Sequence, residues 1–168
     1  MSPPPPHLGD ALRQVMRGVA ATVTVVSTEQ DGVWYGMTAT SFTSLSLDPP
    51  SVLIAVNRDA SLHDPLLRRG AFAVNVLREG PAEAALSQLF GSSAVPSDER
   101  FRHGRWRAHR GGLPILEDAQ AWLVCRIVER LEVGTHTLVV GRVVDVSPLA
   151  ADIAPLVYVD GTYRRLAG

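Results

Sequence analysis

A polar segment that directly follows an apolar one is the part of this sequence best suited to chemistry. Residues 52–56 are a continuous apolar run, and residues 57–61 (Asn-Arg-Asp-Ala-Ser) come next. Backbone N–H groups, a guanidinium and a hydroxyl at such a position are the groups with which proteins hold an anion such as a phosphate. A plain strand and turn, with Ser61 as the N-cap of a short helix, fits the same residues. Asn57, Arg58 and Ser61 are therefore candidate anion ligands, and the purely structural alternative stays open.

A cluster of small hydroxyl side chains precedes the apolar run. It comprises Thr38, Thr40, Ser41, Thr43 and Ser44. Two prolines in the turn at residues 46–50 end the pairing of one strand and fix the entry to the next. Residues 36–61 are therefore predicted to form two strands joined by a turn. The apolar run 52–56 is predicted to be a strand buried on both faces.

Two further polar residues have positions that invite a functional interpretation. His136 follows Gly134 and Thr135 in a predicted turn between two long strands, near a possible barrel rim. A lone histidine in a turn is most often a surface residue, although its charge changes most readily near neutral pH. Asn75 lies inside an apolar strand, where its amide needs partners from the backbone or from a ligand.

The motifs of several other chemistries are absent from the sequence. His103 and His109 have no cysteine partners and no ligand-spaced mate on a helix, so no metal site is predicted. There is no Gly-x-Gly-x-x-Gly after a strand, no phosphate-binding loop with a Gly-Lys pair, and no Gly-x-Ser-x-Gly elbow. A dinucleotide bound in the Rossmann manner and an acyl-transfer triad are therefore not expected.

Composition places the chain among ordinary globular proteins. The length of 168 residues, with 46% hydrophobic and 20% charged residues, suits one domain with a sizeable core. A formal net charge of −1 argues against a nucleic-acid partner held by a broad basic face. Cys125, the single cysteine, lies in an apolar strand, so a buried inert thiol and a reducing compartment are expected.

The proline-rich beginning of the chain differs from the rest. Residues 1–9 are expected to form a disordered tail, followed by one domain over residues 10–168. This tail lacks the basic and apolar regions of a signal peptide, and no apolar run approaches membrane-spanning length. We therefore expect a cytoplasmic protein that does not insert into a membrane.

Hydrophobic periodicity predicts mainly strands. Besides the two around the proline turn, strands are expected over residues 22–27, 34–38, 71–77, 119–131, 138–146, 156–159 and 163–166. Helices are expected from a cap at Asp10 to about Gly18, over 62–69 and over 82–90. Residues 92–110 are expected to be an exposed loop with Phe101 and Trp106 as packing anchors. Regularly spaced strands with Gly and Pro turns predict a mainly β fold, a closed antiparallel barrel with peripheral helices.

Four motifs of the sequence recur together in one known family. They are T-A-x-S-F-x-S-L-S-L-D-P-P from Thr38, N-R-D-x-S from Asn57, G-x-P-x-L from Gly112 and the segment from Gly134 to Val143. Through them the chain resembles the flavin reductase-like family of FMN-binding split β-barrels, over about residues 12–166. This family includes the short-chain reductase components of two-component flavin-dependent monooxygenases.

The resemblance implies a set of site residues. FMN or FAD would be the flavin, and NADH or NADPH the hydride donor. His136 would be the catalytic residue, beside the nicotinamide; relatives have aspartate before this histidine, where the chain has Thr135. Cofactor-binding positions would be Thr38, Ala39, Thr40, Ser41, Ser44, Val56, Asn57, Arg58, Ser61, Asn75 and Tyr163. Tyr163 fits an ordinary strand tyrosine equally well.

The resemblance also implies an activity and partners. The chain would be an NAD(P)H:flavin oxidoreductase, a homodimer that supplies reduced flavin to a separate oxygenase, with no nucleic acid or membrane partner. One alternative is a flavin-binding sensor or carrier without turnover, which the altered G-T-H segment favours. Another is a split-barrel oxidoreductase that keeps its flavin tightly bound. A basic interaction module is disfavoured by the charge balance.

Overall fold

The computed structural model describes residues 7–148 and 150–166. Residues 1–6 of the expected tail, which was residues 1–9, lie outside the described residues. The helices are α1 (Leu8–Arg17), α2 (His63–Arg69), α3 (Pro81–Gly91) and α4 (Ser97–Arg100). The strands are β1 (Ala21–Thr22), β2 (Thr24–Gln30), β3 (Val33–Ala39), β4 (Phe42–Leu47), β5 (Pro50–Asn57), β6 (Ala71–Val76), β7 (Trp106–Ala108), β8 (Pro114–Leu116), β9 (Ala121–Val133), β10 (His136–Val146), β11 (Val157–Val159) and β12 (Thr162–Arg164).

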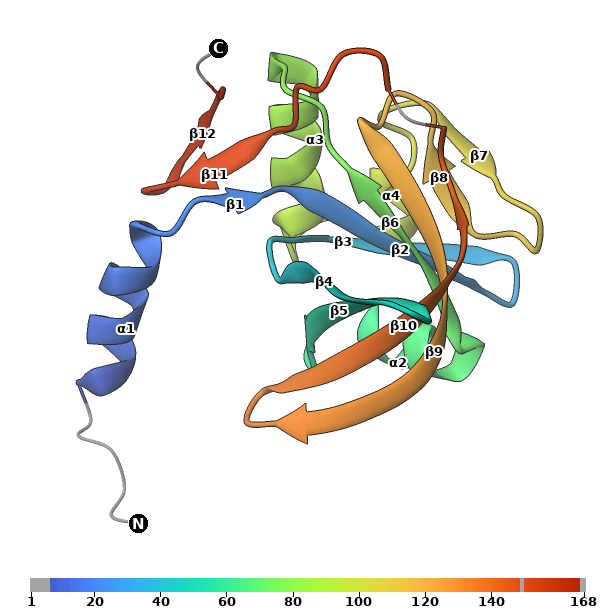
Figure 1. Cartoon of the computed structure of the whole chain (residues 1–168), viewed down its shortest axis with the longest axis horizontal. Coiled ribbons are helices and arrows are strands. Elements are labelled where there is room, and N and C mark those ends of the chain that lie inside the picture. The colour runs from blue at the N-terminus through green and yellow to red at the C-terminus, as the bar shows by residue number, and fades with distance from the viewer. Residues whose placement is uncertain (1–6, 149, 167–168) are drawn as a thin grey trace.

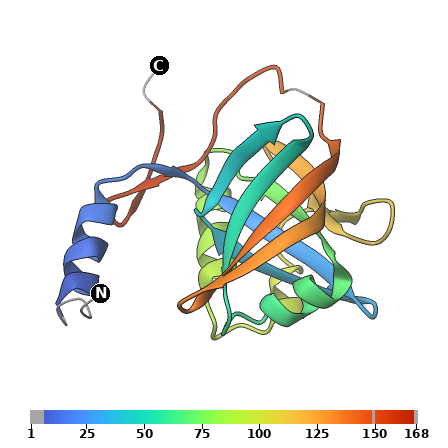
Figure 2. The same ribbon diagram turned by 60° about the horizontal axis from the view of Figure 1, so that its bottom comes forward.

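One curved antiparallel sheet forms the body of the molecule (Figures 1 and 2). Its seven strands lie in the order β3-β2-β6-β9-β10-β5-β4. Only Thr40 and Ser41 separate β3 from β4, and β4 turns away to pair with β5 instead of with β3. The two edge strands of the sheet, β3 and β4, are therefore consecutive in the chain but do not pair with each other. The expectation of a closed barrel is wrong, and the open sheet agrees with a split barrel.

The core fills the inside of this curved sheet. Inward-facing residues of β5, β6 and β10 pack with Leu62, which directly precedes α2, and with Leu66 from α2, all of them buried. Gly141 on β10 has no side chain because its neighbours fill the space. A Cβ atom there would lie 2.5 Å from Cζ of Phe72 and 2.8 Å from Cβ of Cys125. Any larger residue would overpack the barrel interior at this point.

The outward face of the sheet is also apolar around β5. Val52, Ile54 and Val56 face the core at 5%, 0% and 1% exposure, whereas Leu53 and Ala55 are only half-buried. The prediction that both faces of β5 are buried is therefore correct only for the face toward the core. Ala55 lies opposite Leu138, which lies opposite Leu131, and Leu53 lies opposite Val140. We call this set the outer apolar face: Leu53, Ala55, Leu131, Leu138 and Val140.

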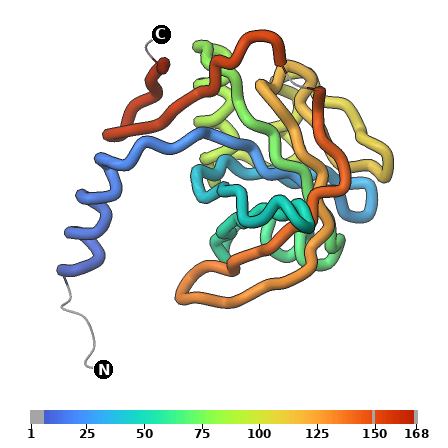
Figure 3. The backbone as a smooth tube through the Cα atoms, viewed as in Figure 1, coloured from blue at the N-terminus to red at the C-terminus, as the bar shows by residue number. Residues whose placement is uncertain are grey.

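The two ends of the described chain meet in an arm beside the sheet. A small sheet of order β1-β11-β12 joins the beginning and the end of the fold, and β1 lies alongside β11 (Figures 1 and 3). Arg17 fixes α1 to this sheet because its Nε and Nη2 donate to Oδ1 of Asp160 at 3.0 and 2.9 Å. Helix α1 itself has no buried residue and stands apart from the barrel.

Several predicted boundaries need correction. Helix α1 begins at Leu8 with His7 at its N-cap position, so Asp10 lies inside the first turn and does not cap it. The expected tail therefore includes two helical residues. Part of the expected loop 92–110 is ordered as α4 and β7, because Phe101 and Trp106 pack edge-to-face with centroids 4.9 Å apart and both contact Phe90. These aromatic contacts bring the segment onto α3.

Cys125 gives a prediction that tests the core directly. Its side chain is fully buried, and burial raises the pKa of the thiol to about 12. The thiolate is the reactive form, so the folded protein should not react with iodoacetamide at pH 8, whereas protein in 6 M guanidinium chloride should react fully. Mass spectrometry after timed alkylation measures both rates. Rapid alkylation of the folded protein would show that this part of the barrel opens.

Candidate functional site

Two adjoining cavities bring several predicted residues together. The first, of about 320 Å³, is lined by Thr38, Thr40 and Tyr163 among others. The second, of about 350 Å³, is lined by Thr38 and Ser61. Both cavities also include Gly91 and Ser92 at the end of α3, so we treat them as one region and call it the paired cavities. Each is in the size range of small-molecule sites.

Strand β3 and the arm build one wall of the paired cavities. The hydroxyl of Thr38 donates to the carbonyl of Ser87 on α3 at 2.6 Å, and the hydroxyl of Tyr163 donates to Oγ of the same serine at 2.9 Å. Tyr158 stands beside Tyr163, with ring centroids 5.3 Å apart and planes inclined at 60°. The two rings therefore give the first cavity an aromatic side.

The corner between β3 and β4 holds the next predicted residues. Ala39 is buried, and its carbonyl accepts a hydrogen bond from the hydroxyl of Thr24 at 2.7 Å. Ser41 donates to the carbonyl of Ala55 at 2.8 Å, which ties the corner to β5. Ser44 is exposed on β4, opposite Val52. Ser41 and Ser44 thus lie outside the lining of the paired cavities, while Thr40 faces the first of them.

The loop after β5 is shaped by its own side chains. Val56 faces the core, and the side-chain oxygen of Asn57 accepts the N–H of Asp59 at 2.9 Å, which makes a tight turn. Ser61 does not cap α2, because Leu62 occupies the N-cap position and no side chain bonds there. The prediction of a serine cap is wrong. The side chain of Ser61 instead lines the second cavity.

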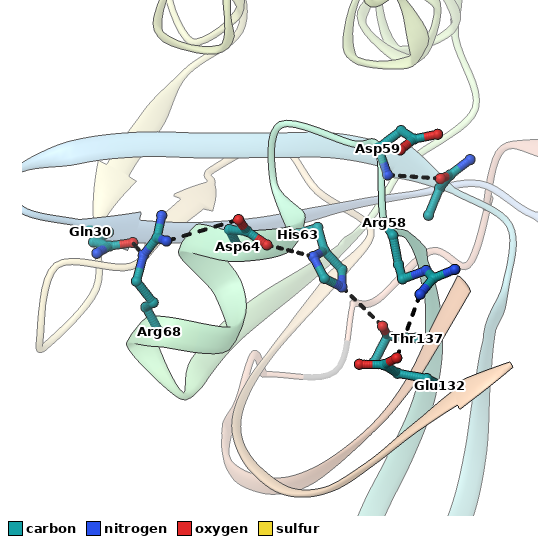
Figure 4. A network of polar contacts seen from close by, with 9 residues as sticks. Gln30, Arg58, Asp59, His63, Asp64, Arg68, Glu132 and Thr137 are labelled. Atoms are coloured by element: carbon teal, nitrogen blue, oxygen red, sulfur yellow. Dashed lines mark hydrogen bonds and ion pairs between the residues drawn. The ribbon is translucent and has the colours of Figure 1, made fainter. Parts of the chain in front are cut away.

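Arg58 points away from that cavity. Its Nη2 donates to the carbonyl of Gly134 at 2.7 Å, and its Nη1 lies 3.5 Å from Oε2 of Glu132 (Figure 4). Its backbone N–H also donates to the carbonyl of Thr135 at 3.0 Å. Gly134 and Thr135 form the turn between β9 and β10, and Glu132 lies near the end of β9. The structure therefore uses Arg58 to hold this turn, and the expected placement of its guanidinium beside the Ser61 cavity is not found.

Asn75 is a residue of the core. It is fully buried, and its Nδ2 donates to the carbonyl of Val25 and to Oγ of Ser27, each at 3.1 Å. Its Oδ1 accepts the N–H of Leu116 at 2.9 Å. Of the two alternatives for this amide, the structure supports pairing within the chain. The predicted position beside a ligand is not supported, because both the nitrogen and the oxygen of the side-chain amide already bond to residues of β2 and β8.

His136 lies at the edge of the outer apolar face. It is the first residue of β10, exposed, and opposite Asn57 in the register of β5. Its Nδ1 lies 2.9 Å from the hydroxyl of Thr135, so the threonine orients the ring. Because side chains alternate along a strand, His136 projects on the same side as Leu138. Gly134 adopts a φ of 57°, which glycine tolerates in this tight turn.

The structure also adds residues that the sequence interpretation missed. Ser92 and Ser93 follow α3 and line the second cavity, where a Gly-Ser-Ser segment after a helix was an available signal. Arg100 is buried beside them, and its guanidinium donates to the carbonyls of Gly36 and Val95, both at 2.9 Å. Burial lowers the pKa of Arg100. Nothing local in the sequence indicates this buried arginine.

Other regions contribute less to a site. A cavity of about 480 Å³ lies between α3 and a loop with His103 and Asp118, away from the predicted residues. Within residues 7–148 and 150–166, no group of three or more histidine, cysteine, aspartate or glutamate side chains is placed to hold a metal ion. In the same part of the chain, no helix has the length and apolar character needed to cross a membrane.

Comparison with known proteins gives consistent relatives. The chain is 39% identical over 161 residues to the reductase component of an FADH2-dependent resorcinol hydroxylase of Rhizobium sp. (strain MTP-10005), covering 95% of this chain and 88% of the relative. It is 36% identical over 156 residues to an NADH-dependent FMN reductase of Pseudomonas syringae pv. syringae (strain B728a), with 93% and 85% covered.

Solved structures agree with these sequence relatives. The NADH:FAD oxidoreductase of Streptomyces globisporus C-1027, in complex with NAD and FAD fragments, superposes with a TM-score of 0.87 at 34% identity. The match covers 99% of this chain and 98% of the other. The model of the flavin reductase like domain matches residues 16–167. The split barrel and these matches agree, and the chain belongs to the flavin reductase-like family.

Proposed function

We propose that this protein is an NADH-dependent flavin reductase that supplies reduced FMN or FAD to a separate oxygenase component. The observation that carries this proposal is the paired cavities, which combine hydroxyl groups with an aromatic wall and adjoin the loop after β5. The relatives support the same activity, since one is an NADH-dependent FMN reductase and another is the reductase component of a resorcinol hydroxylase.

The residues present fit a flavin. Its isoalloxazine is a large flat ring with polar edges, which suits the cavity bounded by Tyr158 and Tyr163 and by the hydroxyl of Thr40. Its phosphate needs donors, and three residues that carry hydroxyl groups, Ser61, Ser92 and Ser93, line the second cavity. We assign these residues to flavin binding and leave Asn75 and the guanidinium of Arg58 out of the site.

The bound flavin would supply the acceptor for a hydride from the nicotinamide. The chain needs no general acid or base for this step, so its contribution is to align two flat rings and exclude water between them. His136 is the proposed contact for the nicotinamide, because it is exposed at the start of β10 and held by Thr135. The proposed role of Thr135 is to preserve the orienting hydrogen bond of the usual aspartate without its charge.

We also propose that two copies associate through the outer apolar face. This face carries five apolar side chains on neighbouring strands, and Leu131 is 62% exposed in the single chain. Such a surface is rarely left to solvent and usually marks an interface. Because His136 projects on the same side, the partner copy would lie next to the nicotinamide position. We place the protein in the cytoplasm, where a reduced thiol such as Cys125 is usual.

A flavin sensor or carrier is the second candidate function. The observation in its favour is Thr135, which lacks the negative charge that relatives have before the histidine. Such a protein would bind flavin in the same cavities without oxidising NADH at a useful rate.

Loss of nicotinamide absorbance at 340 nm tests the proposal. Purified protein is mixed with NADH or NADPH, each with no flavin, FMN or FAD. We expect rapid oxidation of NADH that requires added flavin. Flavin binding seen by fluorescence quenching without turnover would favour the carrier. Turnover by flavin that survives dialysis would favour an oxidoreductase with tightly bound flavin, and the absence of both binding and turnover would contradict every flavin-based function.

A further inference from the structure

A buried histidine contacts the start of β10, next to His136. His63, the first residue of α2, is 8% exposed, and both of its ring nitrogens have partners (Figure 4). Nδ1 lies 2.8 Å from Oδ1 of Asp64, and Nε2 lies 2.9 Å from the hydroxyl of Thr137, which is itself 1% exposed. The histidine therefore links α2 to the second residue of β10.

The chemistry of these partners sets the direction of both bonds. An ionised carboxylate only accepts hydrogen bonds, so Nδ1 of His63 must carry the proton that Asp64 receives. In the neutral ring, Nε2 is then an acceptor, and the hydroxyl of Thr137 donates to it. Asp64 is held in turn by Arg68, whose Nη1 lies 3.9 Å away and whose Nε donates to Gln30 at 3.0 Å. This exposed pair ties the cluster only weakly to β2, so the bond to Thr137 is the main link between His63 and the sheet.

His136 lies between two cross-links from the segment that follows β5. In the residues that precede His136, Gly134 accepts a hydrogen bond from Arg58 and Glu132 forms an ion pair with it. The side chain of Arg58 is 47% exposed, and such contacts are weak in water. On the side after His136, the bond from Thr137 to His63 is buried, where an unmade hydrogen bond is costly. The buried bond is therefore the stronger constraint on the backbone at His136.

From this geometry we propose that His63 is a positioning residue for the reductase reaction. Its bond to Thr137 holds the start of β10 so that His136 meets the nicotinamide in the right orientation. His63 does not touch flavin or nicotinamide, and it acts only through the strand that it anchors. This inference rests on the role proposed for His136.

Two matched pairs of variants isolate the proposed bond. The amide of a glutamine reaches about as far as Nε2 of a histidine, and that of an asparagine about as far as Nδ1. His63→Gln should therefore keep the bond to Thr137, and His63→Asn should lose it. Thr137→Ser keeps the hydroxyl, whereas Thr137→Val removes it and keeps the shape. We expect His63→Asn and Thr137→Val to lower kcat/KM for NADH about two- to tenfold, with the other two near wild type.

Flavin affinity and folding separate this role from a merely structural one. Flavin Kd, measured by fluorescence quenching, should stay within about twofold in all four variants, since the bond lies outside the paired cavities. Thermal unfolding must show each variant folded at the assay temperature. If one of the weakened variants does not fold, the other pair decides. Equal kcat/KM in His63→Asn and His63→Gln, or in Thr137→Val and Thr137→Ser, would overturn the proposal.

A double variant tests whether the effect passes through His136. If His63 acts only by positioning that ring, adding His63→Asn to His136→Ala should lower kcat/KM by less than about twofold further. Losses that multiply would show that His63 acts elsewhere and would overturn the inference. If His136→Ala alone turns over like wild type, the role proposed for His136 fails. If His136→Ala is impaired but His63→Asn turns over like wild type, only the role proposed for His63 fails. The two failures can therefore be distinguished.

Discussion

Replacing His136 with alanine should lower kcat/KM for NADH at least about tenfold while changing flavin Kd less than about twofold. The side chain is exposed at the start of β10 and does not line the paired cavities, so its removal leaves the flavin contacts intact. A hydrogen bond to a charged group is worth about 1.5–3 kcal/mol, and the loss of about 1.5 kcal/mol corresponds to about tenfold in rate. Steady-state kinetics with varied NADH at saturating flavin give the comparison.

Two controls sharpen the result for His136. His103→Ala removes another histidine, one that lines the separate cavity near Asp118, and should leave both parameters unchanged. Thr135→Val removes only the hydroxyl that bonds to Nδ1 of His136, so an intermediate loss is expected. Turnover by His136→Ala equal to that of wild type would take His136 out of the mechanism.

Replacing Leu131 with aspartate should convert a dimer into monomers. Leu131 lies opposite Leu138 in the outer apolar face and is 62% exposed in the single chain, so the change costs the isolated fold little. In an interface, the same carboxylate is buried without a partner. We expect the dissociation constant of the dimer to rise at least about 100-fold, which corresponds to about 2.7 kcal/mol of binding free energy. Light scattering during size-exclusion chromatography measures the mass of each species.

The turnover of this variant links the interface to the site. Because His136 projects on the same side as Leu138, monomers should oxidise NADH more slowly even if they bind flavin. Ile153→Asp is the matched control, since this residue is 70% exposed in the loop after β10 and off the outer apolar face. A Leu131→Asp protein with the mass and activity of wild type would show that this face is not the interface.

The strands were predictable because alternation is a local property of the sequence. Residues 71–77 and 138–146 match β6 and β10 within two residues at each end, and Gly70 ends α2 with a φ of 68° as a glycine there should. The closed barrel was not correct, because closure depends on whether β3 meets β4. The short corner at Thr40 determines whether the two strands pair. The hydrophobic pattern within either strand carries no information about this pairing.

Side-chain directions at the site were harder to predict, since their partners are distant in sequence. The amide of Asn75 bonds to residues 41, 48 and 50 positions away, and the guanidinium of Arg58 to a carbonyl 76 positions away. His63 similarly meets Thr137 across 74 positions. Residue type predicts that each group needs a partner, but only the packed sheet determines which one. Thr38, Thr40 and Ser61 could be singled out from the sequence because they belong to compact motifs, whereas Tyr163 lies outside those motifs.

The arm that joins both ends of the fold affects the order in which parts of the protein can form during synthesis. Arg17 and Asp160 are 143 positions apart, so their bond closes a loop that contains all seven strands of the large sheet. During synthesis, those strands emerge from the ribosome before Tyr158 and Tyr163 do. The aromatic wall of the paired cavities is therefore completed last, after the barrel that supports it. In a nascent chain the large sheet can therefore form before the site is ready for a ligand, whereas the part of the core around Leu156 is completed together with the site.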